Sequence, residues 1–421
     1  MMARKIVTMT LLLVVSVLTS IGQESTDEVE NAEFQIKDLR DNIPEFIKGG
    51  KLNLNIRPRY EFADMDGLDA SNAFTVRTAL GFETAPLYGF RAKVEMEDVT
   101  VLGNEDNYAQ PGGLSGPGKT VVADPEGTEL NQGWLAYRNW DTELMVGRQN
   151  LVLDNSRFIG NVAWRQNHQT LDAVTFKNQS IEDLTLLYGY IWNVNRIFGE
   201  DLAFGDWESE SHMFNISYKG CPWGTLGVYA YLLDFDTDAP LASVNTFGAY
   251  YSGSHSITDD GSVQYRAEYA RQTDTGKNTD FDADYYLAEL GATYDRFNGG
   301  VGYEILGSRG GAGGPGFSTP LATLHKFNGW ADAFLGTPAI GLHDLYVWAG
   351  AEIPKNIPLK FVYHQYTSDT GSMDLGEEYD IVASRKFGEH WGILGKYAYF
   401  DGQQDGPADR HKFWLQGTFD Y

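Results

Sequence analysis

The sequence is poor in features that mark several common classes of protein. Cys221 is the only cysteine among 421 residues, which excludes a secreted domain stapled by disulfides. Basic residues are scarce, since 32 Lys and Arg stand against 58 Asp and Glu and give a formal net charge of −26. Nucleic acid is therefore no expected partner, because a protein that binds it needs a basic face to displace counterions.

Long apolar runs and catalytic motifs are also scarce. Beyond the N-terminus, no segment comes near 18 uninterrupted apolar residues, so no membrane-spanning helix is expected. The eight histidines lack the i, i+4 spacing of a helical zinc site. No Gly-x-Ser-x-Gly nucleophile elbow is present either. We therefore predict a protein that is not an enzyme and that has no cofactor.

The first 50 residues divide into a signal and a short segment that follows it. Arg4 and Lys5 precede an apolar run over 6–18, and small residues follow at Ser20 and Gly22. A basic, an apolar and a small-residue region in this order is typical of a secretory signal peptide. We predict a signal peptide over 1–22, a periplasmic N-terminal segment over 23–50 and one domain over 51–421.

Aromatic residues and glycine are abundant, and they occur in alternating patterns. The chain contains 24 Tyr, 23 Phe, 10 Trp and 47 Gly, a composition that suits strands and turns. Residues 51–62, 89–98 and 262–272 alternate between apolar and polar side chains over the length that a tilted strand needs to cross a bilayer. Weaker segments with the same period bring the count to about eighteen strands.

The connections between these segments alternate in length. Those after even-numbered strands are short, such as 139–141 and 387–390, whereas most of those after odd-numbered strands are long, such as 99–129. An outer-membrane barrel separates short periplasmic turns from long external loops in this way. The predicted fold is therefore all-β, a transmembrane antiparallel up-and-down β-barrel in the bacterial outer membrane, surrounded by its lipid. The last strand ends on Tyr421, which is typical of proteins delivered to the outer-membrane barrel assembly machinery.

Lys and Arg of the clearest strands lie on the polar face. A basic residue that faced lipid at mid-membrane would cost about 2–4 kcal/mol, so these side chains are expected to face the lumen. Acidic residues such as Glu61 and Glu95 share that face, and each lumen charge either pairs with a neighbour or contacts a substrate. The candidate pore-lining residues on strands are Arg57, Arg59, Arg77, Arg91, Lys93 and Arg266.

Two long loops are too apolar to extend into water. Residues 150–169 contain Phe158 and Trp164, and residues 309–340 contain Phe327, Trp330 and Phe334. We expect both to fold into the barrel and to narrow it. Arg157 and Arg165 then become candidates for a selectivity constriction. Other external loops are acidic, and either structural calcium or simply solvated charge accounts for them.

Four short stretches resemble the central signature of the alginate-export outer-membrane family. They read Gly-Arg-Gln-Asn-Leu over 147–151, Arg-Phe-Ile-Gly over 157–160, Trp-Arg-Gln-Asn over 164–167 and Leu-Asp-Ala-Val over 171–174. The segments 317–321 and 325–334 are similar to a second signature. The resemblance implies an eighteen-stranded barrel that passes a polyanionic polysaccharide along basic lumen residues. It transfers that role to Arg148, Arg157 and Arg165 by motif, and to Arg57, Arg59, Arg77 and Arg91 by strand position.

The function predicted is an outer-membrane channel that passes oligo- or polysaccharides by passive diffusion through a charged lumen. An alginate-like anionic saccharide is one candidate cargo, and neutral saccharides are the other. Two alternatives stay open, a general diffusion porin for small solutes and an exported soluble β-rich carbohydrate-binding protein. The sequence sets neither the direction of transport nor the oligomeric state.

Overall fold

The computed structural model describes residues 45–200, 202, 204–236, 239–275, 281–309 and 316–421. The predicted signal peptide and most of the 23–50 segment lie outside these residues. The chain divides into two compact units, and the smaller one comprises the residues up to Gly50 together with Thr84–Leu87. Its described part is a single helical turn over 45–48 and a backbone hydrogen bond of 3.0 Å from Ala85 N to Phe46 O.

The larger unit, Lys51–Glu83 with Tyr88–Tyr421, is built from strands. Its short 3₁₀ turns are η1 (Glu105–Asn107), η2 (Pro111–Gly113), η3 (Pro240–Ala242) and η4 (Leu324–Lys326). Its strands are β1 (Lys51–Met65), β2 (Ser71–Glu83), β3 (Phe90–Val101), β4 (Gly127–Asn139), β5 (Thr142–Gln149), β6 (Thr170–Asn178), β7 (Leu184–Asn195), β8 (Asp206–Cys221), β9 (Gly224–Leu233), β10 (Val244–Thr258), β11 (Gly261–Thr273), β12 (Asp282–Tyr294), β13 (Phe297–Leu306), β14 (Leu342–Ile353), β15 (Ile357–Thr367), β16 (Asp374–Phe387), β17 (Trp391–Gly402) and β18 (Arg410–Asp420).

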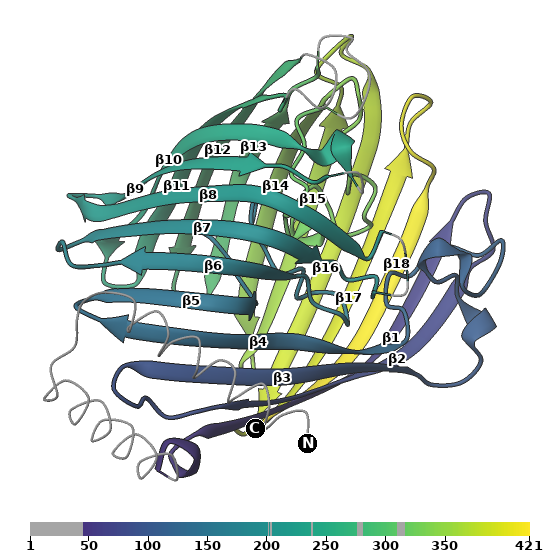
Figure 1. Cartoon of the computed structure of the whole chain (residues 1–421). Helices are drawn as coiled ribbons and strands as arrows, with labels where there is room; N and C mark the ends of the chain where they lie inside the picture. The colour runs from purple at the N-terminus through teal and green to yellow at the C-terminus, as the bar shows by residue number, and fades with distance from the viewer. Residues whose placement is uncertain (1–44, 201, 203, 237–238, 276–280, 310–315) are drawn as a thin grey trace, which may run out of the picture. The chain divides into compact units, whose positions relative to one another are not determined.

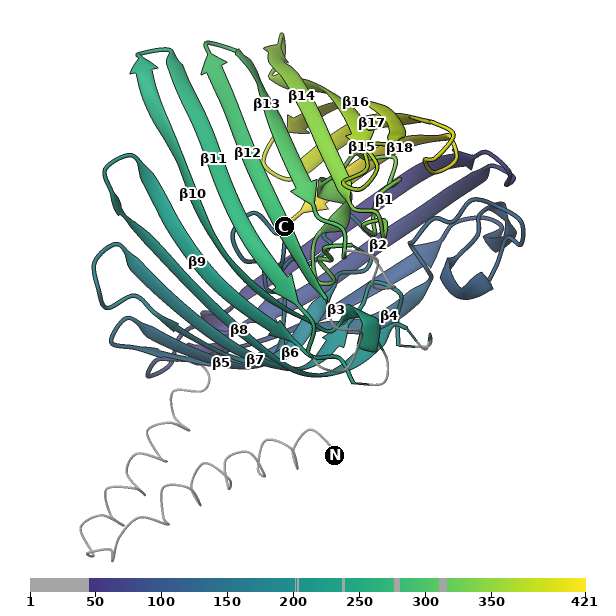
Figure 2. The same cartoon turned by 90° about the horizontal axis from the view of Figure 1, so that it is seen from above.

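These strands form a closed antiparallel barrel. Each strand pairs with its sequence neighbours in one 18-stranded sheet, and β1 also pairs with β18 (Figures 1 and 2). In this seam Asn55 lies opposite Asp420 and Met65 opposite Arg410. Closure leaves no unpaired edge, which a bilayer would not tolerate. The predicted fold class and strand number are thus confirmed.

The two faces of the barrel wall differ as the alternation predicts. On β1 the inward residues Arg59 and Glu61 are buried. Apolar side chains on the outward face are exposed, such as Leu80 of β2 at 50% and Val94 of β3 at 58%. Such an apolar outer band is what lipid covers in an outer-membrane barrel. Trp140, Trp223 and Trp391 lie at the short turns and are more than half exposed, as expected of aromatic residues at a membrane interface.

The described residues contain no helix that is long and apolar enough to cross a membrane.

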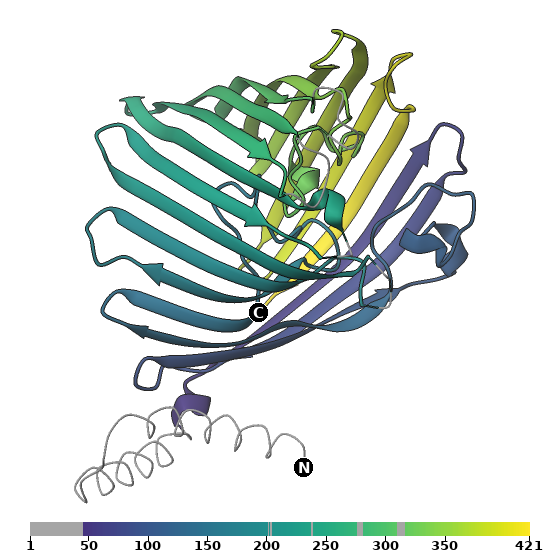
Figure 3. The same cartoon turned by 45° about the horizontal axis from the view of Figure 1, so that its top comes forward.

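The interior is filled mainly by two loops. Residues 150–169 (the strap) and residues 316–341 (the second inner loop) lie inside the ring of strands (Figure 3). Phe158 and Ile159 of the strap pack in one apolar cluster with Phe317 and Leu321 of the second inner loop. The inner wall adds aromatic rings to this cluster, so most apolar side chains of the two loops are buried or partly buried, as their composition predicts, with Val152 and Leu335 as exceptions.

Candidate functional site

The strap and the second inner loop are joined to each other by backbone hydrogen bonds. Ile159 and Leu321 form a parallel bridge, and Gly160 N donates to Leu321 O at 2.8 Å. Thr323 N donates to Ser156 O at 3.1 Å. The two loops therefore form one hydrogen-bonded body inside the lumen.

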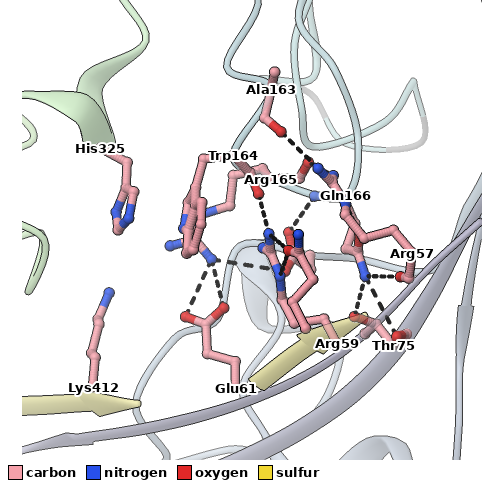
Figure 4. A network of polar contacts seen from close by, with 12 residues as sticks. Arg57, Arg59, Glu61, Thr75, Ala163, Trp164, Arg165, Gln166, His325 and Lys412 are labelled. Atoms are coloured by element: carbon pink, nitrogen blue, oxygen red, sulfur yellow. Dashed lines mark hydrogen bonds and ion pairs between the residues drawn. The ribbon is translucent and has the colours of Figure 1, made fainter. Parts of the chain in front are cut away.

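Arg57 holds the strap against β1. Its Nε donates to Gln166 Oε1 at 2.9 Å and its Nη1 to Ala163 O at 2.8 Å, while its Nη2 donates to Arg165 O (Figure 4). Gln166 Nε2 in turn donates to Thr75 Oγ1 of β2 at 2.9 Å. All acceptors of the Arg57 guanidinium are neutral oxygens, so its positive charge is not compensated by direct contact with a carboxylate of the described residues.

Arg165 lies at the centre of a buried carboxylate cluster, of which Figure 4 labels Glu61. Its guanidinium is 3.1 Å from Glu61, 2.9 Å from Asp332 and 3.8 Å from Asp124. Burial alone would lower the pKa of Arg165, but these three carboxylates raise it above its ordinary value. Lys412 of β18 also donates to Asp332 at 2.6 Å. The cluster connects the barrel wall to both inner loops.

Trp164 stands between cations from two walls. Arg59 lies over its ring at 4.4 Å, and Lys396 of β17 contacts it at 4.2 Å. The ring also stacks on His325 of the second inner loop at 4.5 Å. Lys396 Nζ is 2.8 Å from His325 Nε2, and an ammonium can only donate. His325 is therefore neutral and donates from Nδ1 to Asp332 at 2.6 Å, in keeping with burial that lowers its pKa well below the usual range.

The strap is tied to the far wall by two further arginines. Arg157 donates to both oxygens of Glu304 on β13, at 2.8 and 3.1 Å, and is itself 2% exposed. Burial alone would lower the pKa of Arg157, but Glu304 and then Tyr285 raise it. Arg266 on β11 contacts Asp154 of the strap and also pairs with Glu268 at 2.7 Å. The strap thus runs across the lumen from β1 to β11 and β13.

Most of the predicted site residues are engaged in ion pairs. Arg77 pairs with Glu97, Lys93 with Glu95 at 2.9 Å, and Arg91 with Glu83 and Glu143 at 2.8 and 2.7 Å. Eight of the nine have a carboxylate within 4.0 Å, namely Arg59, Arg77, Arg91, Lys93, Arg148, Arg157, Arg165 and Arg266. Arg57 is the exception among the nine. Pairing therefore outweighs free charge among these nine residues.

Arg148 does not lie where the sequence places it. It shares the outward face of β5 with Leu144 and Val146, which are 47% and 43% exposed. There it forms two hydrogen bonds to Asp172, at 2.8 and 3.1 Å. Arg148 therefore does not line the pore, contrary to the prediction. The inward position at this point of β5 belongs to Gln149, which is buried and accepts a hydrogen bond from Thr175 at 2.9 Å.

A cavity of about 510 Å³ lies beside the strap on the β1–β3 wall. Arg57 and Arg77 both line it and are directly opposite each other on β1 and β2. Like charges placed opposite each other on neighbouring strands repel, and an anion between them would relieve that repulsion. The remaining side chains of the lining include Asn53, Asn55, Glu95, His168 and Asp420.

Residues 51–303 match the sequence model of a protein family described as Alginate export. The chain belongs to the alginate export family. No curated protein matches it. Among solved structures it is similar to OccK9 (OpdG) of Pseudomonas aeruginosa, with a TM-score of 0.71 and 15% identity over 89% of this chain and 100% of that one. OpdK of the same organism, solved with vanillate, gives 0.72 and 13% over 89% and 99%. OccAB2 of Acinetobacter baumannii gives 0.68 and 15% over 89% and 99%.

This alginate export family member is thus an outer-membrane channel and not an enzyme, and its place is the bacterial outer membrane. Among the described residues no group of three or more His, Cys, Asp or Glu side chains is arranged to hold a metal ion. Calcium in the acidic loops stays a prediction.

One stretch of the sequence matches a phosphate-binding motif but does not have the structure that the motif requires. Residues 113–120 read Gly-Leu-Ser-Gly-Pro-Gly-Lys-Thr, which has the spacing of a phosphate-binding Walker loop. Such a loop must lead into a helix, whereas these residues lie in the connection between β3 and β4. Lys119 Nζ donates to Ala70 O at 3.0 Å instead of facing a phosphate site. In this member of the alginate export family the segment fastens an external loop.

Several residues of the site carry no signal in the sequence. Asp124 and Lys396 hold the strap or its partners, yet neither belongs to a catalytic or ligand-binding pattern. Lys396 alternates with outward apolar residues on β17, and this parity alone could have placed it in the lumen.

Proposed function

We propose that this protein is a passive channel for anionic saccharides of the uronate type, with short oligomers as the cargo that its lumen accommodates. The observation that carries the proposal is the pair Arg57 and Arg77, which face one cavity from opposite positions on neighbouring strands. Arg57 has only neutral acceptors. Arg77 already pairs with Glu97, so a uronate carboxylate would supply the anionic partner that Arg57 lacks.

The electrostatics of the lumen support an anion more than a neutral sugar. A cation in a narrow, partly dry passage concentrates field lines and attracts anions more strongly than it would at an open surface. The cavity volume of about 510 Å³ falls within the range of small-molecule sites, about 300–1,000 Å³. The inner loops fill much of the remaining lumen, which favours a saccharide chain in extended form over a folded one.

A general diffusion porin for small solutes is the second candidate. It is favoured by the extent of charge pairing, since seven of the eight predicted cations that face the lumen already have a carboxylate partner. A wall of paired charges discriminates weakly between anions and cations. The two candidates differ in whether a uronate oligomer blocks ion current more strongly than a neutral oligomer of equal length.

The charge of Arg57 can be separated from its role in holding the strap. Arg57→Gln and Arg57→Lys both lose the forked contacts to the strap carbonyls, but only Arg57→Gln loses the charge. We expect Arg57→Gln to weaken block by a uronate oligomer about 10- to 100-fold, the range of one charge-assisted hydrogen bond. Arg57→Lys should lose clearly less. Current block in planar bilayers, with the reversal potential under a salt gradient, measures both effects.

Arg148→Gln is the matched control, because Arg148 lies on the outward face and its loss should leave block unchanged. Equal weakening in the two Arg57 variants would mean that a loose strap, not the missing charge, is responsible. Equal block by uronate and neutral oligomers in the wild type would favour the general porin.

A further inference from the structure

His168, near the end of the strap, is held by the wall at one ring nitrogen. Its Nδ1 lies 3.1 Å from Arg77 Nη2 and 3.3 Å from Asn131 Nδ2. Its backbone N donates to Glu97 Oε1 at 2.8 Å. The other oxygen of Glu97 is 3.2 Å from the same Nδ1, but it already accepts from Arg77 Nε at 2.5 Å.

These contacts decide the protonation of the ring. A guanidinium and an amide nitrogen can only donate, so these two donors, set against one carboxylate oxygen that already accepts from Arg77, favour Nδ1 as the acceptor and place the proton on Nε2. A second proton at Nδ1 would point at Arg77. Burial, followed by the charges of Arg77, Arg57 and Lys93, lowers the pKa of His168 well below its usual range. The ring is therefore a neutral donor in a fixed orientation.

The Nε2–H group of His168 has no hydrogen-bond partner among the described residues. The side chain is 12% exposed, and it lines the cavity together with Asn53, Asn55 and Arg57. A donor that is fixed at one end and unpartnered at the other is suited to an uncharged acceptor. The neighbouring amides offer both donors and acceptors, as a sugar hydroxyl requires.

We propose that His168 is the donor of a saccharide hydroxyl subsite in this cavity, next to the position at which Arg57 and Arg77 meet a carboxylate. The subsite rests on the proposed function for its setting, but its own ligand is the hydroxyl or ring oxygen of a pyranoside, charged or neutral. Arg57 distinguishes anionic from neutral saccharides, and His168 distinguishes saccharides from plain organic anions.

The test compares the wild type with His168→Phe and His168→Gln in planar bilayers. Block is measured with a uronate oligomer and with a neutral oligomer of the same length. His168→Phe removes the donor and should weaken both blocks by a common factor of about 3 to 10, the range of a neutral hydrogen bond. His168→Gln retains a donor of similar reach and should recover most of the loss.

A pH comparison tests the neutral state of the ring. The charged groups that face it or line the same cavity are Arg57, Arg77, Lys93, Glu95, Glu97 and Asp420, and both His168 variants keep them. Between about pH 7.5 and about pH 5.5, on either side of the ordinary histidine pKa, the wild type and His168→Phe should respond alike. A uronate block that strengthens in acid only when His168 is present would overturn the proposal.

The failures of the two proposals are distinguishable. If His168→Phe leaves both blocks unchanged while Arg57→Gln weakens the uronate block, the hydroxyl subsite is wrong and the anionic channel stands. If only the neutral oligomer blocks and His168→Phe weakens that block, the subsite stands and the anionic cargo is wrong. If neither oligomer blocks the wild type, both are wrong.

Discussion

Replacing Arg165 with alanine is expected to open the channel at neutral pH, and acid is expected to narrow it again. Arg165 is the cation that Glu61, Asp124 and Asp332 share at the junction of the strap and the second inner loop. Without Arg165, Asp124 keeps only Arg59 and Asp332 keeps only Lys412, while Glu61 has no ion-pair partner left among the described residues. Leaving a buried charge without its partner costs about 3–5 kcal/mol. The strap should therefore detach from β1, and single-channel conductance should rise.

The response of the wild type to acid has the opposite sign. Burial alone would raise the pKa of Asp332, but His325, Lys412 and Arg165 hold it well below the usual range. A carboxylate with a depressed pKa stabilises the folded arrangement at and above the ordinary pKa of aspartic acid, and this contribution is lost as the pH falls through the lowered value. Strong acid should therefore loosen the wild-type loops, whereas in Arg165→Ala protonation relieves the repulsion among the three carboxylates.

Conductance measured against pH in both proteins checks this reversal of sign. Arg165→Lys is the matched control, because it keeps a cation but cannot contact three carboxylates with one guanidinium group. Its conductance should lie between those of the wild type and Arg165→Ala. Wild-type conductance in Arg165→Ala at neutral pH would show that the strap is held without this cluster.

The pair Arg157 and Glu304 should give the largest coupling energy of the ion pairs in the lumen. Arg157 forms two hydrogen bonds to Glu304, and both residues are nearly inaccessible to solvent. Either single change, Arg157→Met or Glu304→Leu, strands a buried charge and should destabilise the protein by about 3–5 kcal/mol. The double variant replaces the pair with apolar groups and should recover most of that loss.

Denaturant unfolding of the four proteins in detergent measures this double-mutant cycle. Arg91→Met with Glu143→Leu provides the comparison, since that pair is partly open to solvent and its coupling should be below about 1 kcal/mol. If Arg157→Met and Glu304→Leu lower the free energy of unfolding no more than Arg91→Met and Glu143→Leu do, the far end of the strap does not depend on the pair of Arg157 and Glu304.

The strands and the inward loops could be predicted from the sequence because both depend on local patterns. Alternation with period two fixes which residues face lipid, and a loop with Phe158 and Trp164 cannot remain in water. The partners of the cations could not be predicted, because they are distant along the chain. Arg57 and Gln166 are separated by 109 residues, and Arg165 and Asp332 by 167. Only the closed barrel brings such residues together.

Arg148 shows how a motif can mislead when it is not compared with strand parity. The resemblance placed it in the lumen, whereas Val146 and Leu144, two and four residues earlier, are outward apolar positions of the same strand. Side chains of a strand alternate without exception until a bulge intervenes, and no register shift separates Val146 from Arg148 in the pairing of β5 with β6. The alternation along this strand therefore predicts that Arg148 faces outward.

The seam between the first and last strands has a consequence for the order of assembly. Arg59 of β1 donates to Gln416 of β18 at 2.6 Å, and Trp414 of β18 meets Trp164 edge to face. Lys412 adds its bond to Asp332 from the same strand. The surface against which the strap packs is therefore shared by β1 and β18, and it does not exist until these two strands pair. Closure of the barrel and narrowing of its lumen by the strap therefore occur together, late in insertion. A precursor in which β1 and β18 are not yet paired would have the wider and more permeable lumen.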